Sequence, residues 1–163
     1  MNIIIKKNYL FFKDYKLKCS LGKLGIKKIK KEGDLSTPKG LFKLGTLYFR
    51  CDRNKNLRTQ MNKKKIKKNM GWCDDIKSKS YNKEIRFPYK YRAEKLYRKD
   101  RLYDIFINIK YNTNPTIKGK GSAIFLHLAS KNYKPTKGCI AISKKGFLKI
   151  LPFIKKRTKI YIG

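Results

Sequence analysis

The chain has 163 residues and carries 44 Lys and Arg against 10 Asp and Glu, for a net charge of +34. Hydrophobic residues make up 40%, enough to bury one core, which excludes disorder throughout. No apolar run approaches the roughly 20 residues of a membrane-spanning helix. A surface this basic attracts polyanions, but the basic residues are spread along the whole chain, so charge alone identifies no site.

The first half of the chain is predicted to form short strands. Residues 2–6 and 9–12 are apolar runs, and residues 15–19 alternate between apolar side chains and lysines. This period of two is typical of a half-buried strand. Residues 41–49 have strand-like composition after a loop rich in Gly and Pro. The lysine-rich stretch 52–70 is predicted to be a mobile surface excursion.

The second half adds further strands and a helix. Residues 91–98 are predicted to make one or two helical turns. Residues 103–111 alternate as in a half-buried strand, whereas 123–128 is a nearly continuous apolar run, typical of a strand buried on both faces. The apolar spacing in 144–154 predicts an amphipathic helix, and 158–162 a closing strand. The sum is a mainly β domain.

The four cysteines form no C-x-x-C pair, which argues against a zinc ribbon. We expect Cys19, Cys51 and Cys73 to be reduced, buried and structural, although their spacing leaves disulfides open. Cys139 differs because it directly follows Gly138. Glycine permits a tight turn that exposes the sulfur at a strand end and aims backbone N–H groups at a developing oxyanion.

His127 is the only histidine, and it precedes Cys139 by 12 residues. A nucleophilic cysteine needs a nearby base, and an imidazole has an ordinary pKa near 6.5. The two residues would then meet within one hydrogen bond at the mouth of an open groove. The alternative is a structural histidine and a buried cysteine, and composition alone does not choose between them.

The order of several motifs resembles the L,D-transpeptidase catalytic domain (YkuD) family. His127, a spacer and Thr136-Lys-Gly-Cys139 are similar to that family's strand-borne His and its Ser/Thr-x-Gly-Cys segment. Gly33-Asp34 and Thr37-Pro38-x-Gly40 are similar to its early motifs, and the resemblance covers roughly residues 15 to 163. Two positions depart from many members, which carry His at the position of Lys137 and Arg or Asn at that of Ala141.

The resemblance implies one catalytic domain over residues 1–163, with a β-sandwich fold, one or two small helices, and no metal or cofactor. Cys139 would be the nucleophile and His127 the general acid and base. The N–H of Gly138, together with that of Cys139, would stabilise the oxyanion. The group that orients the imidazole is often a backbone carbonyl in this family.

The resemblance also implies the substrate, which would be a peptidoglycan stem tetrapeptide. The chain would release its D-Ala and pass the acyl group to an amine, forming a 3–3 crosslink. Thr136, Lys137, Ser122 and Trp72 are candidates for substrate binding. A turn-shaping threonine, a solvated lysine and a core or lid tryptophan are the alternatives. The cell envelope would be the compartment. The apolar run that follows Met1, however, is too short to be the hydrophobic region of a signal peptide.

Other functions compete with this hypothesis. Water as acceptor would make the chain an L,D-carboxypeptidase. The charge and the interleaved tyrosines fit a nucleic-acid-binding module, but no helix-turn-helix, finger or RNP-type motif supports one. A non-catalytic wall-binding protein on the same fold is a third possibility. Papain-like proteases place Cys before His in the chain, and the order here is reversed.

Overall fold

The computed structural model describes all of residues 1–163. Strands dominate it, with one short α-helix and one 3-10 turn, so the predicted mainly β class is confirmed. The elements are β1 (Ile3–Lys6), β2 (Tyr9–Phe12), β3 (Tyr15–Ser20), β4 (Ile26–Lys27), β5 (Thr37–Pro38), β6 (Gly40–Phe49), β7 (Lys63–Lys65), β8 (Met70–Cys73), β9 (Glu84–Arg86), β10 (Ala93–Lys95), β11 (Ile105–Ile109), β12 (Phe125–Leu128), β13 (Ile140–Ile142), α1 (Lys144–Ile150), η1 (Leu151–Phe153) and β14 (Lys159–Ile162).

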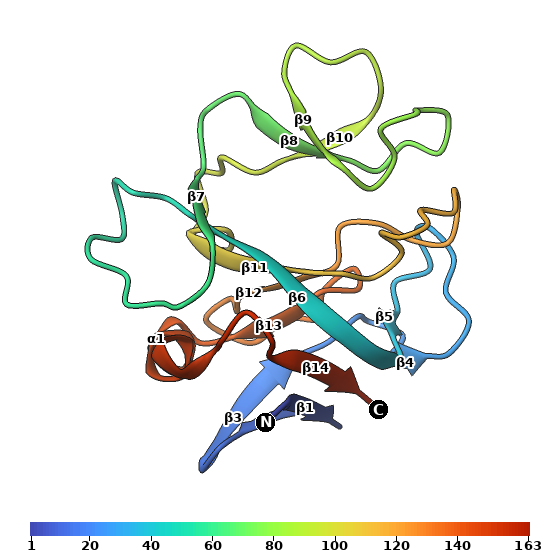
Figure 1. The fold of residues 1–163 in the computed structure, drawn as a ribbon. Coiled ribbons are helices and arrows are strands. Elements are labelled where there is room, and N and C mark those ends of the chain that lie inside the picture. The colour runs from blue at the N-terminus through green and yellow to red at the C-terminus, as the bar shows by residue number, and fades with distance from the viewer.

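The main sheet curls into a barrel-like ring. Its nine strands follow the order β11-β12-β13-β3-β2-β1-β14-β6-β7, and β11 also pairs with β6. The ring therefore closes on every strand except β7, which extends from β6 (Figure 1). Closure leaves few unpaired strand edges. The expected sandwich of two stacked sheets is not confirmed, because one sheet wraps around the core.

The two ends of the chain meet in this ring. β14 pairs in parallel with β1 and antiparallel with β6, so the termini lie close together (Figure 1). The alternation predicted over residues 15–19 is confirmed on β3, where Lys16 and Lys18 are exposed and the apolar side chains between them are half-buried or buried. The closing strand predicted over 158–162 is also confirmed, as β14.

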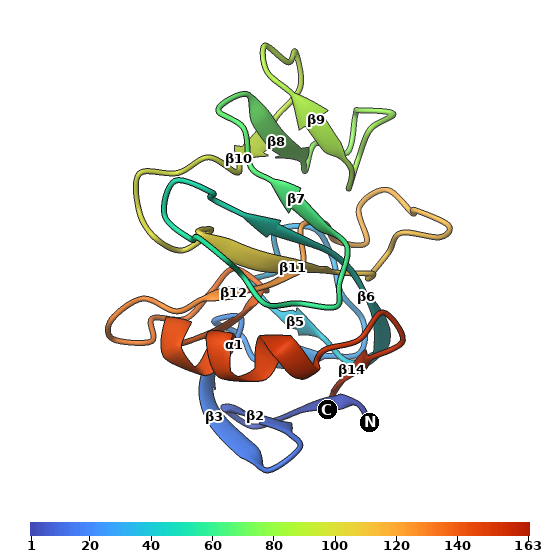
Figure 2. The same cartoon turned by 60° about the vertical axis from the view of Figure 1, so that its left-hand side comes forward.

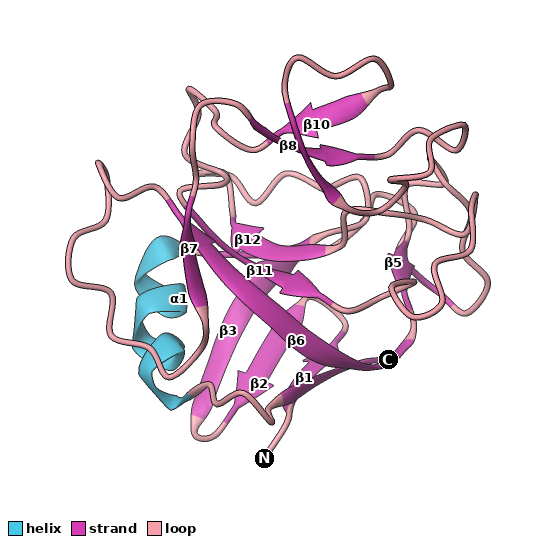
Figure 3. Cartoon of the chain, turned by 45° about the horizontal axis from the view of Figure 1, so that its top comes forward, coloured by secondary structure: helices cyan, strands magenta, loops and turns pink.

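The predicted amphipathic helix is confirmed as α1, which lies along one side of the ring (Figures 2 and 3). Ser143 caps it, since its Oγ accepts a hydrogen bond from the N–H of Gly146. Phe147 and Ile150 on its inner face are fully buried. The regular helix ends at Ile150, and a 3-10 turn containing Pro152 follows, because proline has no N–H to continue the helix.

A separate three-stranded sheet, in the order β10-β8-β9, lies beyond β11 (top of Figure 1). The sequence prediction missed it. The helical turns predicted over 91–98 are wrong, because Ala93–Lys95 forms β10 there. The predicted excursion over 52–70 is partly wrong, since it contains β7, paired with β6, and the buried side chains of Met61 and Ile66.

Two hydrophobic clusters lie on opposite faces of β11 and β12. We call the larger one, inside the ring, the aliphatic core; it holds 23 residues, mostly Ile and Leu. The smaller one, under the three-stranded sheet, is the aromatic cluster. Its nine buried members are Tyr48, Ile66, Met70, Trp72, Leu96, Tyr103, Phe106, Phe125 and Cys139. β11 is thus buried on both faces, rather than half-buried as predicted.

All four cysteines are free thiols. Cys19 and Cys73 are buried as predicted, whereas Cys51 is exposed, so its predicted burial is wrong. No helix is long and apolar enough to cross a membrane.

Candidate active site

Strands β12 and β13 bring the two predicted reactive residues to one face of the sheet. The strands are parallel, with Leu126 opposite Ile140 and His127 opposite Ala141. Cys139 directly precedes β13 and therefore lies level with Phe125. Because side chains alternate along a strand, the side chains of His127 and Cys139 share the face that bears the aromatic cluster. The fold therefore places the two residues on one face of the sheet.

The turn before Cys139 has the tight geometry predicted for it. Gly138 has a φ of +145°, and a Cβ there would lie 2.8 Å from the carbonyl oxygen of Ser36, so only glycine fits. The Thr136 hydroxyl donates to the carbonyl oxygen of Cys139 at 2.6 Å and accepts from the N–H of Gly138 at 3.1 Å. Thr136 thus shapes the turn. It also occupies the Gly138 N–H, so the structure contradicts the expected use of that donor for an oxyanion.

The Cys139 thiol is held by backbone groups. Its Sγ donates to the carbonyl oxygen of Ala123 at 3.1 Å and accepts from the N–H of Phe125 at 3.4 Å. The residue is 9% exposed, so the expected exposed sulfur is wrong. Burial, with a further contribution from the charge of Glu94, raises the thiol pKa to about 12. The thiol is therefore protonated at neutral pH.

The His127 imidazole is also buried and neutral. Burial lowers its pKa to about 4, so the ring carries no charge at neutral pH. Its Nδ1 lies 2.8 Å from the carbonyl oxygen of Leu128, and a proton on Nδ1 would donate to that oxygen and leave Nε2 as the basic nitrogen. A backbone carbonyl thus orients the ring. No hydrogen bond joins Sγ to the imidazole, so the expected direct bond is absent.

The other predicted contact residues lie in different surroundings. Trp72 packs edge-on against Phe125, with ring centroids 5.2 Å apart, and its Nε1 donates to Asn82 Oδ1. It belongs to the aromatic cluster and is 5% exposed. Ser122 is buried and donates to the Glu32 carboxylate at 2.8 Å. Lys137 is exposed beside the turn.

Sequence reasoning missed three ionisable residues around the thiol. Tyr103 packs edge-on against His127 at 5.2 Å between ring centroids, and its hydroxyl donates to Glu94 Oε1 at 2.6 Å. Burial raises the pKa of Glu94. Lys30 is 4% exposed and reaches the same neighbourhood from the loop before β5. No local pattern marks Glu94 or Lys30; Tyr103 stands out only as the first residue of an alternating strand.

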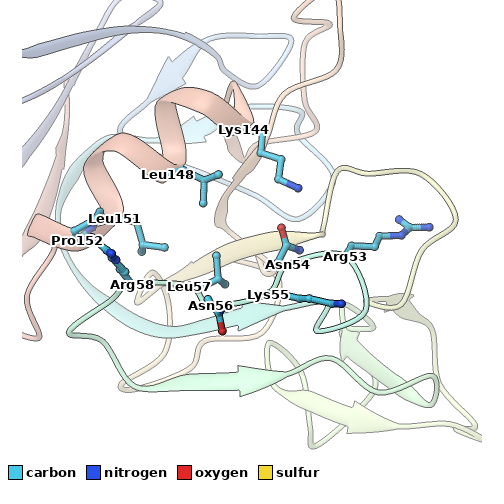
Figure 4. Close-up of a pocket in the computed structure, with 10 residues that line it drawn as sticks. All are labelled: Arg53, Asn54, Lys55, Asn56, Leu57, Arg58, Lys144, Leu148, Leu151 and Pro152. Carbon is cyan, nitrogen blue, oxygen red and sulfur yellow. The ribbon is translucent and has the colours of Figure 1, made fainter.

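A separate pocket of about 350 Å³ lies between the 53–58 segment and the α1–η1 region (Figure 4). It contains neither His127 nor Cys139, and it has four basic side chains but no acidic one. Its lining residues are Arg53, Asn54, Lys55, Asn56, Leu57, Arg58, Lys144, Leu148, Leu151 and Pro152. It holds no cysteine, serine or histidine, so the reactive groups predicted from the sequence lie elsewhere.

Comparison with known proteins relates the chain to a family. A family model described as YkuD, L,D-transpeptidase catalytic domain, matches residues 5–162. The match includes β12, the turn and β13. No curated protein and no solved structure matches the chain.

Proposed function

The chain belongs to the L,D-transpeptidase catalytic domain family, and on that premise we propose that it is a cysteine-dependent peptidoglycan L,D-transpeptidase. The observation that carries the proposal is the placement of His127 and Cys139 on one face of adjacent parallel strands. The match over nearly the full length supports one catalytic domain over residues 1–163. We place its work in the cell envelope, where peptidoglycan lies.

The reaction would start from two neutral groups. As Cys139 Sγ attacks the carbonyl of the stem's third residue, His127 Nε2 takes the thiol proton. The C–S bond forms, the C–N bond to D-Ala breaks, and the imidazolium returns its proton to the leaving amine. An amine of a second stem then attacks the thioester. The new C–N bond to this amine replaces the C–S bond. His127 takes a proton from the amine and passes it to Cys139 Sγ, which restores the thiol.

The oxyanion needs a donor other than Gly138. None of the hydrogen bonds in loops and turns uses the backbone N–H of Cys139, so we assign the role to that group. One such donor contributes about 3 kcal/mol to transition-state stabilisation. Thr136 supports the donor indirectly, because its two hydrogen bonds fix the turn on both sides of it.

Access to the thiol requires movement. Sγ points to the Ala123 carbonyl rather than to the imidazole, and the aromatic cluster covers it. We propose that the stem displaces part of this cover and that Sγ then rotates toward His127. Trp72 and Ser122 would act as supports for the cover, and Lys137, exposed beside the turn, would contact a stem carboxylate.

The test compares Cys139→Ala with Cys19→Ala, which removes a second buried thiol, on β3 and in the aliphatic core. Each variant is incubated with purified tetrapeptide muropeptides, and crosslinked dimers and free D-Ala are measured. Cys139→Ala should lose both products, and Cys19→Ala should retain them. Dimer formation or D-Ala release by Cys139→Ala at the wild-type rate would contradict the proposal, whereas D-Ala release without dimers would identify water as the acceptor.

A further inference from the structure

The Lys30 ammonium is buried beside the turn that carries Cys139. A Cβ on Gly138 would lie 3.6 Å from Lys30 Nζ, and a Cβ on Gly121 would lie 2.9 Å from Lys30 Cε. The absence of a Cβ at Gly121 therefore leaves room for the lysine side chain. Two glycines thus allow one ammonium to reach the backbone next to the thiol, where water is largely absent.

Asp34 fixes that ammonium in place. Its Oδ1 lies 2.8 Å from Lys30 Nζ, and its carboxylate also accepts the backbone N–H groups of Lys31 and Ser36, each at 2.9 Å. These hydrogen bonds hold the pKa of Asp34 well below its usual range. The carboxylate stays ionised across the range in which an enzyme works, and so it holds the Lys30 ammonium in place.

Glu94 on β10 presents a half-buried carboxylate that lies 3.7 Å from the half-exposed Arg98, and Tyr103 and His127 present neutral groups. Glu94 raises the pKa of Cys139 and Lys30 lowers it. Lys30 is therefore the buried cation that opposes Glu94 as negative charge develops on sulfur.

We propose that Lys30 is a positioning residue that acts through Cys139: its ammonium, held by Asp34, stabilises the negative charge on Sγ as the thiol proton leaves. The biological meaning of this role for Lys30 rests on the proposed function. Its test measures only the reactivity of the thiol, so the role of Lys30 and the proposed function can fail separately.

The test measures alkylation of Cys139 in the folded protein by iodoacetamide, which is neutral, and by iodoacetate, which is an anion. Peptide mass spectrometry separates Cys139 from the exposed Cys51, which serves as internal standard. Lys30→Met should slow the iodoacetamide reaction at pH 8 about three- to fivefold, because less thiolate forms while each thiolate becomes somewhat more nucleophilic. The same substitution should slow alkylation by iodoacetate further, because the cation that attracts this anionic reagent is gone.

Three further variants separate charge from shape. Lys31→Met removes an equal charge from an exposed neighbour and should match wild type. Lys30→Arg should restore part of the rate. Asp34→Asn removes the negative charge but keeps an oxygen that can accept from Lys30 Nζ, so the cation stays in place and Cys139 should react at least as fast as in wild type. Circular dichroism and thermal unfolding establish that each variant is folded.

Two results would overturn the proposal. One is wild-type rates in Lys30→Met with both reagents. The other is an equal loss in Lys30→Met and Asp34→Asn with an unchanged ratio of the two reagents, which would mean that the ion pair only supports the loop. Loss of transpeptidation with normal thiol chemistry in Lys30→Met would leave the proposed function standing and remove this one.

Discussion

The two hydrophobic clusters share strands but differ in what they contain. The aliphatic core inside the ring holds mostly Ile and Leu and no ionisable group except the Cys19 thiol. The aromatic cluster on the other face holds Cys139 and Tyr103 and borders His127 and Glu94. Burial raises the pKa of Cys19 on the first side and of Cys139 on the second. The difference is therefore that only the second side places a thiol on the same face as an imidazole.

The largest expected effect comes from a substitution that weakens the aliphatic core and leaves the aromatic cluster intact. Ile107 is fully buried on β11, and Ile107→Ala should lower the free energy of unfolding by about 2–5 kcal/mol, because it loses buried apolar surface and leaves a cavity. Urea unfolding measures this loss. Alkylation of Cys139 in the folded variant should stay near the wild-type rate. A small stability loss with a large change in thiol reactivity would show that the two regions are not separable in this way.

The next effect tests the aromatic side through its histidine. The folded pKa of His127 is about 4, against about 6.5 in an unfolded chain. The unfolded state therefore binds the proton more readily between these values, and the associated stability is lost as the pH falls from 6.5 toward 4. The loss approaches about 3 kcal/mol at the lower end. It should appear in urea unfolding of the wild type at pH 7 and pH 4.5.

His127→Gln supplies the reference for that measurement. The carboxylates titrate in both proteins, so the difference between their pH profiles isolates the imidazole. Parallel profiles would mean that the ring titrates in the folded state as it does in water. The aromatic cluster would then not exclude water as the structure indicates.

A smaller change targets the support of the thiol. Asn82 Oδ1 accepts hydrogen bonds from Trp72 Nε1 and from the N–H of Ala123, whose carbonyl holds Cys139. Trp72→Phe keeps an aromatic ring but removes one donor. It should cost about 1–2 kcal/mol of stability and raise the alkylation rate of Cys139. An unchanged or slower alkylation rate would argue against this support.

The smallest effect lies outside both clusters. Lys64 on β7 pairs with Glu84 at 2.8 Å, and the lysine side chain is 44% exposed. Lys64→Met should change the free energy of unfolding by less than about 1 kcal/mol, because exposed ion pairs are weak and screened by salt. A larger change that disappears at high salt would show that the lysine-rich strand contributes more than its position suggests.

The strands of the ring were predicted better than those of the three-stranded sheet that lies over it. Periods of two and short apolar runs are local signals, and they located β1, β3, β6 and β12. β8 and β10 were missed because they are short and flanked by charged residues, and because they pair only within the small sheet that they form with β9. His127 and Cys139 were selected because the order of motifs around them resembles that of a known family, since composition alone did not distinguish a catalytic pair from a structural one.

The surroundings of the site could not be predicted in the same way. Lys30 and Glu94 come from loops and strands distant in the chain, and only folding brings them to the thiol. The open groove and the direct Cys–His hydrogen bond were expected from chemistry alone. The structure has instead a covered thiol bonded to the Ala123 carbonyl, because the aromatic cluster packs over it.

The most direct measurement is the mass of the intact protein after exposure to a carbapenem, a strained amide that acylates active nucleophiles. The account predicts one stable adduct that maps to Cys139, forms more slowly in His127→Gln, and is absent in Cys139→Ala. No adduct, or an adduct on Cys51 with Cys139 untouched, would contradict the assignment of Cys139 as the nucleophile.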